Sequence, residues 1–305
     1  MDVEKNSKVA VIIRTMIVSG FHITKAASQP AGLRVDCLRY DEFGLPIQYC
    51  VFISDRPVGQ TAKEALIKSA KGNYQVPLLV EDCREKRDGV LRLKDFLDRL
   101  GGPIDVWLPL SSDFEAMLNT LGHNKLVEGM VGKADDSFEE AVKQGLQFLF
   151  GSRVIRYGQE RLFEKLPDGV GFAQSDALIL YDAKAYGKGY KFSQDSIRTF
   201  SDYVRKFNDR YSGYVGKVYA FVVISGDFAD SEKALKSRDS ELYASCQTRL
   251  VCLNAVQLAK LVNLIRDKIS FRNAIDWKRI LAATPLEEKE LEAELKRIAK
   301  DKIVR

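Results

Sequence analysis

Three residues in the second half of the chain have the types and spacing of a hydrolytic site: Asp168, Asp182 and Lys184. Pro167 and Gly169 on either side of Asp168 predict a turn into a strand, and the apolar run ALILYDA over 177–183 predicts a buried strand. Side chains two apart on a strand project from the same face, and Asp168 belongs to the preceding strand of a hairpin. We therefore expect two carboxylates and one ammonium to converge.

Such a group suits the hydrolysis of a phosphodiester. Mg²⁺ prefers carboxylate, carbonyl and water oxygens, and an ion held by Asp168 and Asp182 would polarise a phosphate and acidify an attacking water. Lys184 would orient that water or offset the developing negative charge. Taken alone, however, the three residues are more typical of an ordinary turn and strand end with a solvated lysine nearby.

The flanking sequence carries a family resemblance. PD, a spacer and D-A-K resemble the PD-(D/E)XK nuclease motif, and AYGKGY over 185–190 resembles its continuation in the FokI-type cleavage domain of type IIS restriction endonucleases. VISGDF over 223–228 and TPLEE over 284–288 are similar to the same domain in the same order. The resemblance covers residues 136–305 and favours the nuclease interpretation over that of an ordinary turn.

The resemblance implies a set of functional residues. Mg²⁺ would be bound by Asp168, Asp182 and the carbonyl oxygen of Ala183, with Lys184 beside the attacking water, and hydrolysis would leave a 5′-phosphate. In the FokI-type domain a helix before the hairpin contributes an acid near the metal, and Glu139 matches that position. Acidic residues also complement the dipole in the first turn of any helix, which is a second interpretation of Glu139.

The length of 305 residues predicts two domains, and the composition is that of a globular protein. No apolar run has the length of a membrane span, and Arg14 interrupts the run VAVIIRTMIV, so we expect no signal peptide, no membrane anchor and a cytoplasmic location. Five cysteines without CxxC spacing and two isolated histidines argue against a zinc site.

The net charge of +5 is unevenly distributed along the chain. Residues 1–130 hold 17 Lys and Arg and 17 Asp and Glu, whereas residues 131–305 hold 30 and 25. The whole basic excess therefore lies in the half that resembles a nuclease. An excess of this size is compatible with binding of a phosphate backbone but does not by itself indicate it.

The sequence predicts an α/β fold with two domains: residues 1–121, a linker over 122–136, and a nuclease domain over 137–305 with a restriction-endonuclease-like mixed sheet flanked by helices. The N-terminal half has the predicted order α-β-β-α-β-α-β, which resembles the nuclease core itself. Asp36 matches the first acid, but no acid-x-lysine follows on the next strand. Two interpretations are open: an inactive copy used for scaffolding or DNA recognition, or an unrelated α/β domain.

These expectations define a Mg²⁺-dependent endonuclease acting on double-stranded DNA, either a restriction endonuclease or the cleavage subunit of a heteromer with a recognition subunit. A repair or transposition nuclease with the same site is an alternative. A catalytically silent DNA-binding or assembly subunit is another, although intact Asp168, Asp182 and Lys184 argue against it. No residue pattern indicates a target sequence or a DNA-reading element.

A helix over 193–207 has one apolar stripe and, on the opposite face, charges of alternating sign at Asp195, Arg198, Asp202 and Arg205. An interface about a two-fold axis brings the same surface of both subunits together and must be complementary to itself. FokI-type domains dimerise through the corresponding helix with an acid and an arginine one turn apart. The sequence therefore predicts a homodimer, with ion pairs within a single helix as the alternative.

Overall fold

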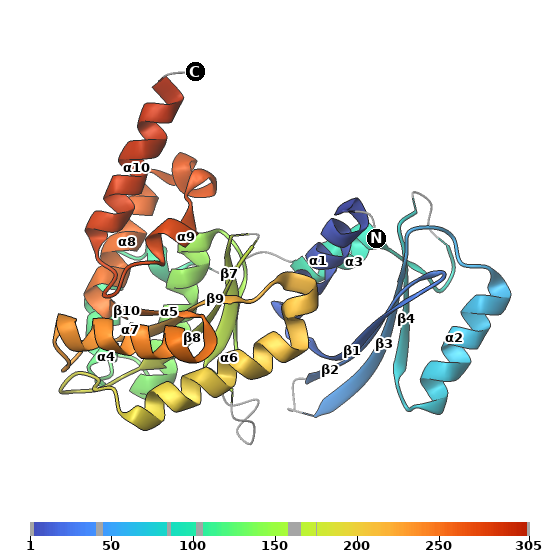
Figure 1. Ribbon diagram of the computed structural model, residues 1–305, viewed down its shortest axis with the longest axis horizontal. Coiled ribbons are helices and arrows are strands. Elements are labelled where there is room, and N and C mark those ends of the chain that lie inside the picture. The colour runs from blue at the N-terminus through green and yellow to red at the C-terminus, as the bar shows by residue number, and fades with distance from the viewer. Residues whose placement is uncertain are drawn as a thin grey trace. The chain divides into compact units, whose positions relative to one another are not determined.

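The structure, a computed structural model, describes residues 3–40, 45–83, 87–101, 106–157, 166–174 and 176–303. The chain divides into two compact units, Met1–Pro103 and Ile104–Arg305. Each has its own sheet and its own flanking helices (Figure 1). Within the described ranges, no helix combines the length and apolar character needed to cross a membrane.

The first unit is built on a five-stranded sheet of order β1-β2-β3-β4-β5. Strands β1 to β3 are antiparallel, and β3, β4 and β5 are parallel. Its elements are α1 (Val3–Ile17), β1 (His22–Gln29), β2 (Gly32–Tyr40), β3 (Pro46–Ser54), α2 (Gln60–Gly72), β4 (Val76–Glu81), β5 (Leu91–Arg92) and α3 (Leu93–Gly101).

The second unit is built on a five-stranded sheet of order β10-β9-β8-β7-β6. Strands β6 to β8 are antiparallel, and β8, β9 and β10 are parallel. Its strands are β6 (Val154–Arg156), β7 (Gly169–Gln174), β8 (Ala177–Lys184), β9 (Val218–Ser225) and β10 (Arg249–Asn254). Its helices are η1 (Leu108–Leu110), α4 (Phe114–Gly122), α5 (Ala134–Phe150), α6 (Gln194–Val215), α7 (Glu232–Cys246), α8 (Ala255–Asp267), η3 (Ile269–Ala274), α9 (Trp277–Ile280) and α10 (Glu288–Ile303).

The two units share one topology. In each, a helix precedes three antiparallel strands, and a crossover helix then leads from the third strand to a parallel fourth strand. They differ at the next crossover: α7 joins β9 to β10, whereas the described part of the β4–β5 connection contains no helix. The mixed α/β fold expected from the sequence is thus confirmed for both halves. Strand β1 was not predicted, because half of its residues are exposed and its sequence lacks an apolar alternation.

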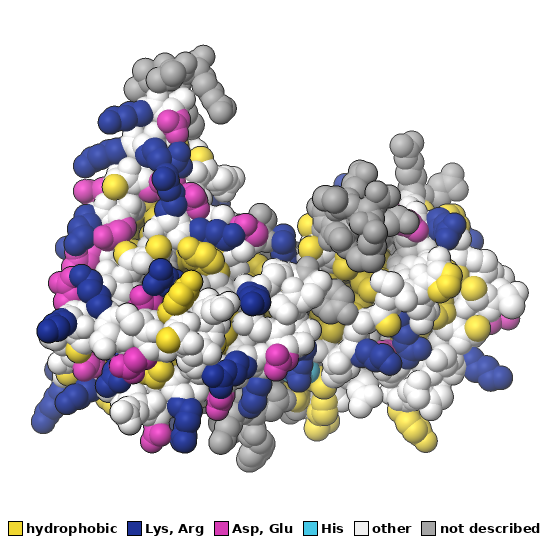
Figure 2. Space-filling view, in the orientation of Figure 1, with side chains coloured by type: hydrophobic (Ala, Val, Ile, Leu, Met, Phe, Trp, Pro, Cys, Tyr) yellow, Lys and Arg dark blue, Asp and Glu magenta, His cyan; other side chains and the backbone are white. Residues whose placement is uncertain are grey.

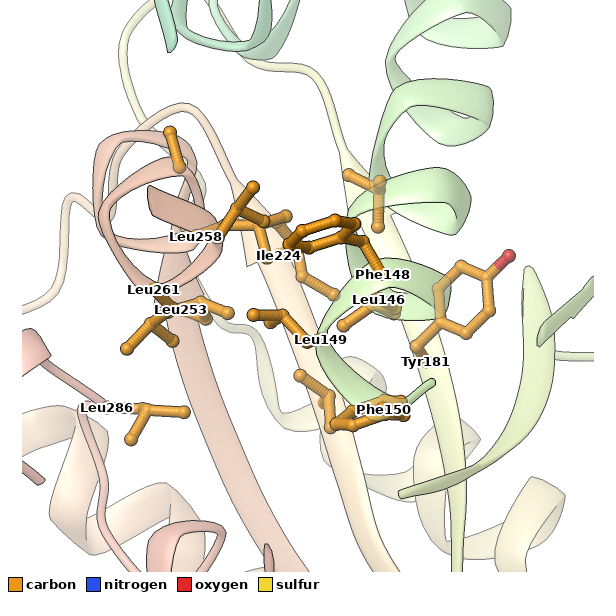
Figure 3. Close-up of a cluster of buried hydrophobic side chains, with 14 of the residues drawn as sticks. Leu146, Phe148, Leu149, Phe150, Tyr181, Ile224, Leu253, Leu258, Leu261 and Leu286 are labelled. Carbon is orange, nitrogen blue, oxygen red and sulfur yellow. The ribbon is translucent and has the colours of Figure 1, made fainter. Parts of the chain in front are cut away.

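The core of the second unit lies between its sheet and the layer of α4, α5 and α8, while α6 and α7 cover the other face (Figure 1). Leu146 and Leu149 from α5 pack with Ile224 from β9 and Leu258 from α8 (Figure 3). On the opposite face Phe200 of α6 stacks on Phe221 of β9, with ring centroids 4.3 Å apart. Strands β8 and β9 are buried on both faces, which explains their continuous apolar sequences.

Helix α4 belongs to the second unit. Phe114, Leu118 and Leu121 are buried in the same core as Phe138 of α5 and Leu258 of α8. The compact unit therefore begins earlier than the domain boundary that the sequence suggested at residues 121 and 122. From the sequence, the apolar face of α4 predicts that the helix is buried, but it does not predict which of the two sheets the helix packs against.

This packing predicts that residues 104–305 fold as a unit and that residues 137–305 alone do not. Burial of a large apolar side chain stabilises a fold by about 1.5–3 kcal/mol, so loss of Leu108, Phe114, Leu118 and Leu121 costs roughly 6–12 kcal/mol, comparable to the whole free energy of unfolding of a domain. Thermal unfolding of the two fragments measures the difference. Equal cooperativity and equal midpoints would contradict this role of α4.

Candidate active site

The hairpin of β7 and β8 brings the three predicted residues together. Gly169 pairs with Tyr181, which sets Asp168 at the entry of β7 opposite Asp182 near the end of β8. Tyr181 and Ala183 lie in the core on the α5 side, so Asp182 and Lys184 project from the other face of the strand. The Nζ of Lys184 lies 2.6 Å from Oδ2 of Asp182 and 3.9 Å from Oδ2 of Asp168.

The backbone of β8 fixes the first acid. The N–H of Ala183 donates a hydrogen bond of 2.7 Å to Oδ2 of Asp168, so the carboxylate at the start of one strand is tied to the strand that carries the other two groups. The hydroxyl of Ser225 on β9 donates to the carbonyl oxygen of Lys184 over 2.6 Å. Hydrogen bonds from neighbouring strands therefore fix both the Asp168 carboxylate and the backbone of Lys184.

Burial dominates the electrostatics of the cluster. The Asp182 side chain is only 5% exposed, and this burial raises the pKa of its carboxyl above the ordinary value. The negative charge of Asp168 raises the pKa further, while the positive charge of Lys184 lowers it. Burial acts to lower the pKa of Lys184, but the charges of Asp182 and Asp168 outweigh it and raise that pKa. One ammonium thus faces two carboxylates, an excess of negative charge in a poorly solvated place.

This donor set fits a hard divalent cation. The carboxylates of Asp168 and Asp182 both face the Lys184 ammonium, at 3.9 and 2.6 Å, and Ala183, between Asp182 and Lys184 in the chain, adds a backbone carbonyl. Within the described ranges no three His, Cys, Asp or Glu side chains gather as a metal cage. Mg²⁺ commonly takes only one or two protein carboxylates and keeps several waters, so a two-acid site suits it better than it suits Ca²⁺ or zinc.

Glu139 lies beside the cluster but is bound to another partner. Burial raises its pKa, and the charge of Asp168 raises it further, which places the two carboxylates within electrostatic reach. The guanidinium of Arg156 on β6 donates to Glu139 over 2.7 Å and to Asp136 over 2.7 Å. The sequence did not single out Arg156, because its role depends on the contact between α5 and β6. A single arginine in a short strand does not by itself indicate a functional residue.

The four charged residues predicted at a dimer interface lie on the exposed face of α6. Asp195 pairs with Arg198 at 3.2 Å, and Asp202 with Arg205 at 3.7 Å, each within the helix. All four side chains are more than half exposed. The helix begins with a capping box in which the side chains of Ser193 and Ser196 each accept a hydrogen bond from the other's backbone N–H.

In the first unit, Asp36 occupies the middle of β2, directly opposite Cys50 of β3. Its carboxylate accepts hydrogen bonds from Arg34 at 3.0 Å and Gln75 at 3.1 Å. Two residues beyond Cys50, on the same face of β3, lies Phe52. Asp168 directly precedes β7, whereas Asp36 lies inside β2, and the β3 residues on its face are a thiol and a phenyl ring rather than an acid and a lysine.

A mixed sheet with two carboxylates and a lysine at the end of its central hairpin defines a nuclease core of the PD-(D/E)XK class. The comparison with protein families matches residues 110–279 to the cleavage domain of FokI. The match spans more than half of the chain, and the chain belongs to the FokI cleavage domain family, a family of DNA-cleaving domains.

Two solved structures are similar to part of the chain. One is the restriction endonuclease FokI bound to DNA, 19% identical, with 52% of this chain and 28% of that chain covered and a TM-score of 0.40. The other is a structure of the restriction endonuclease FokI, 18% identical, with 54% and 27% covered and a TM-score of 0.37. The chain thus matches little more than a quarter of the length of those proteins. A comparison with curated proteins gave no match.

The residue after Asp168 must be a glycine. A Cβ at Gly169 would lie 2.1 Å from the carbonyl oxygen of Ile155 and 2.3 Å from the ring of Tyr181. The hydroxyl of that tyrosine is buried and has no hydrogen-bond partner among the described residues, and it points away from the apolar cluster (Figure 3). Neither the β6 backbone nor this confined ring can move aside cheaply.

We expect Gly169→Ala to destabilise the protein by about 1–3 kcal/mol, because overpacking forces strands β6 and β7 apart. The matched control is Gly213→Ala on α6, where no atom lies within 4 Å of the added methyl group. Alanine at that exposed helix position should stabilise by about 0.4–1 kcal/mol. Chemical denaturation of both variants measures the two shifts. Destabilisation no larger for Gly169→Ala than for the control would refute the close contact.

Proposed function

We propose that the chain is a Mg²⁺-dependent DNA endonuclease that hydrolyses phosphodiester bonds, as a restriction endonuclease or the cleavage subunit of one. The observation that carries the proposal is the convergence of Asp168, Asp182 and Lys184 at the end of β8 in a FokI-family domain. The proposed substrate is double-stranded DNA, since the family is one of DNA-cleaving domains, and the basic excess of residues 131–305 is compatible with a phosphate backbone.

Each residue of the cluster has a separate role. Asp168, Asp182 and the carbonyl oxygen of Ala183 would hold the cation, which when bound polarises the scissile phosphate and acidifies a water. Lys184 keeps its proton, because its pKa is raised, and its ammonium offsets negative charge that develops on the phosphate. Arg156 forms an ion pair with Glu139 and holds it at the edge of the site. From there the Glu139 carboxylate would contact the attacking water or another water bound to the cation.

The first unit is, on this proposal, a catalytically silent copy of the nuclease core that serves scaffolding or DNA recognition. Its sheet repeats the strand order and directions of the second unit. Among its described residues the β2–β3 hairpin carries one acid, Asp36, which is engaged by Arg34 and Gln75; its partner on β3 is Cys50, and the lysine opposite it, Lys25, belongs to β1. One chain would then cut one strand.

Cleavage of both strands would require two chains, and α6 is the proposed contact. Two copies packed antiparallel about a point near Phe200 would pair Arg198 of each with Asp202 of the other, and Asp195 with Arg205. The observed pairs within α6 do not oppose this exchange, because exposed pairs of this kind stabilise a helix by only a few tenths of a kcal/mol. A recognition subunit could bind elsewhere on the same dimer.

The catalytic assignment predicts that Asp182→Asn and Lys184→Ala each lower the nicking of supercoiled plasmid by roughly 10²- to 10³-fold while binding to duplex DNA persists. Asp182→Asn removes a charged ligand of the cation, and Lys184→Ala removes the ammonium beside it. Chelation of divalent cations should stop cleavage by the parent, and added Mg²⁺ should restore it.

Two control variants accompany this experiment. Asp176→Asn changes an acid at the opposite end of β8 that pairs with Lys278, and Asp36→Ala changes the acid of the first unit. Both should cut at the parental rate. Parental cleavage by both active-site variants would place the chemistry elsewhere, and a loss in Asp36→Ala like that in Asp182→Asn would show that the first unit is catalytic.

The dimer proposal predicts that Asp202→Arg alone and Arg198→Asp alone each suppress double-strand cleavage, since each places like charges face to face across the two-fold axis. A mixture of the two variants should restore it through a heterodimer. Glu232→Arg on the neighbouring helix α7 is the control, and it should leave double-strand cleavage unchanged. If each α6 variant alone cuts both strands as well as the parent at low protein concentration, α6 is not the interface.

A further inference from the structure

The loop that follows Lys184 is held rigidly at the end of the sheet where the candidate site lies. The N–H of Tyr186 donates to the carbonyl oxygen of Gly122, at the end of α4, over 3.0 Å. Tyr190 donates to the carbonyl of Asp227 over 2.8 Å and accepts from Ala229 over 2.9 Å. The loop is thus bonded on one side to the end of α4 and on the other to the segment after β9.

Lys188 lies at the tip of this loop. A turn closed by the hydrogen bond from Gly189 N–H to the carbonyl of Tyr186 places Lys188 at its third position, exposed to solvent. Gly189 has a φ of +82° and packs against the backbone of Phe228 and Ala229, so the turn depends on the lack of a side chain there. The backbone of Lys188 is therefore fixed, and only its side chain is free to reorient.

A second lysine belongs to the neighbouring segment. Lys125 is exposed and follows the end of α4, three residues after the Gly122 carbonyl that Tyr186 binds. The chain turns there through Asn124, whose φ is +58°. Two lysines that are far apart in the sequence thus stand on backbone segments that touch, beside the last residue of the catalytic strand.

Neither of these two lysines has an ion pair among the described residues. On α6, α7 and α10 the basic groups are largely matched by acids three or four residues away (Figure 2). The acids near the loop, Asp227 and Asp230, direct their carboxylates to the backbone N–H groups of Phe228 and Phe192. The charges of Lys125 and Lys188 are left for a partner outside the chain.

We propose that Lys125 and Lys188 bind backbone phosphates of the DNA that flank the scissile phosphate. The inference rests on the proposed function, since it names the contacts by which that substrate is positioned. When a phosphodiester reaches Asp168 and Asp182, its neighbouring phosphates must pass this end of the sheet. Lysines on fixed backbone supply point charges for them without a sequence preference.

The test is the salt dependence of binding of a fluorescein-labelled duplex, measured by anisotropy between about 50 and 200 mM salt in an Asp182→Asn background that does not cleave. Each phosphate contact contributes about 0.9 to the slope of log affinity against log salt, so Lys125→Ala with Lys188→Ala should lower the slope by up to about 1.8. Unfolding midpoints should be unchanged because both side chains are exposed.

The control removes the same charge elsewhere. Lys217 precedes β9 and Lys268 follows α8, so both lie at the opposite end of the sheet, and both are exposed without an ion pair among the described residues. Lys217→Ala with Lys268→Ala should keep the parental slope. An unchanged slope in the Lys125 and Lys188 variant, or an equal fall in the control, overturns the proposed contact.

The two proposals fail separately. If the parent nicks plasmid in Mg²⁺ and the slope of the Lys125 and Lys188 variant equals that of the parent, the nuclease function stands and the lysine contact is wrong. If the parent binds no duplex at all, DNA is not the substrate and both proposals are wrong. If the slope falls as expected but no variant or parent cleaves, the lysines bind DNA in a chain whose catalytic role is refuted.

Discussion

The candidate site depends on one hydrogen bond between two strands. The N–H of Ala183 reaches Oδ2 of Asp168 over 2.7 Å and holds that carboxylate against Asp182. Without it, the residue at the entry of β7 would be free to turn into solvent, where an ionised acid is more stable. The pairing of Gly169 with Tyr181 supports the same geometry, because only a residue without a side chain lets β6 and β7 approach the tyrosine ring.

The two units separate fold from chemistry within one chain. Both have a helix, three antiparallel strands and a crossover to a parallel strand, yet among the described residues only the second unit places two acids and a lysine at the end of its hairpin. In the first unit the face of the β2–β3 hairpin that bears Asp36 also carries Cys50 and Phe52. The sheet can therefore present such a cluster but does not require one, and the side chains alone decide whether cleavage is possible.

Sequence patterns were sufficient where the decisive interactions are local. The apolar runs of β8 and β9 indicate strands buried on both faces, and a spacing of two sets Asp182 and Lys184 on one face. They were insufficient where a residue acts through a distant partner. Arg156 binds Glu139 and Asp136 only because β6 lies beside α5, and α4 joins the second unit only because its apolar face finds α5 and α8. The exposed edge strand β1 shows no apolar alternation from which to predict it.

Rigid backbone also explains how opposite charges can remain separate at one end of the sheet. An excess of negative charge at Asp168 and Asp182 would attract any mobile lysine nearby, and Lys184 already lies 2.6 Å from Asp182. Lys125 and Lys188 stand on segments fixed by backbone hydrogen bonds, and their side chains are exposed rather than folded into the cluster. On the proposed function, a cation would enter between the carboxylates while phosphates would meet the lysines outside. A more mobile loop would let Lys188 neutralise the carboxylates and compete with the metal for them.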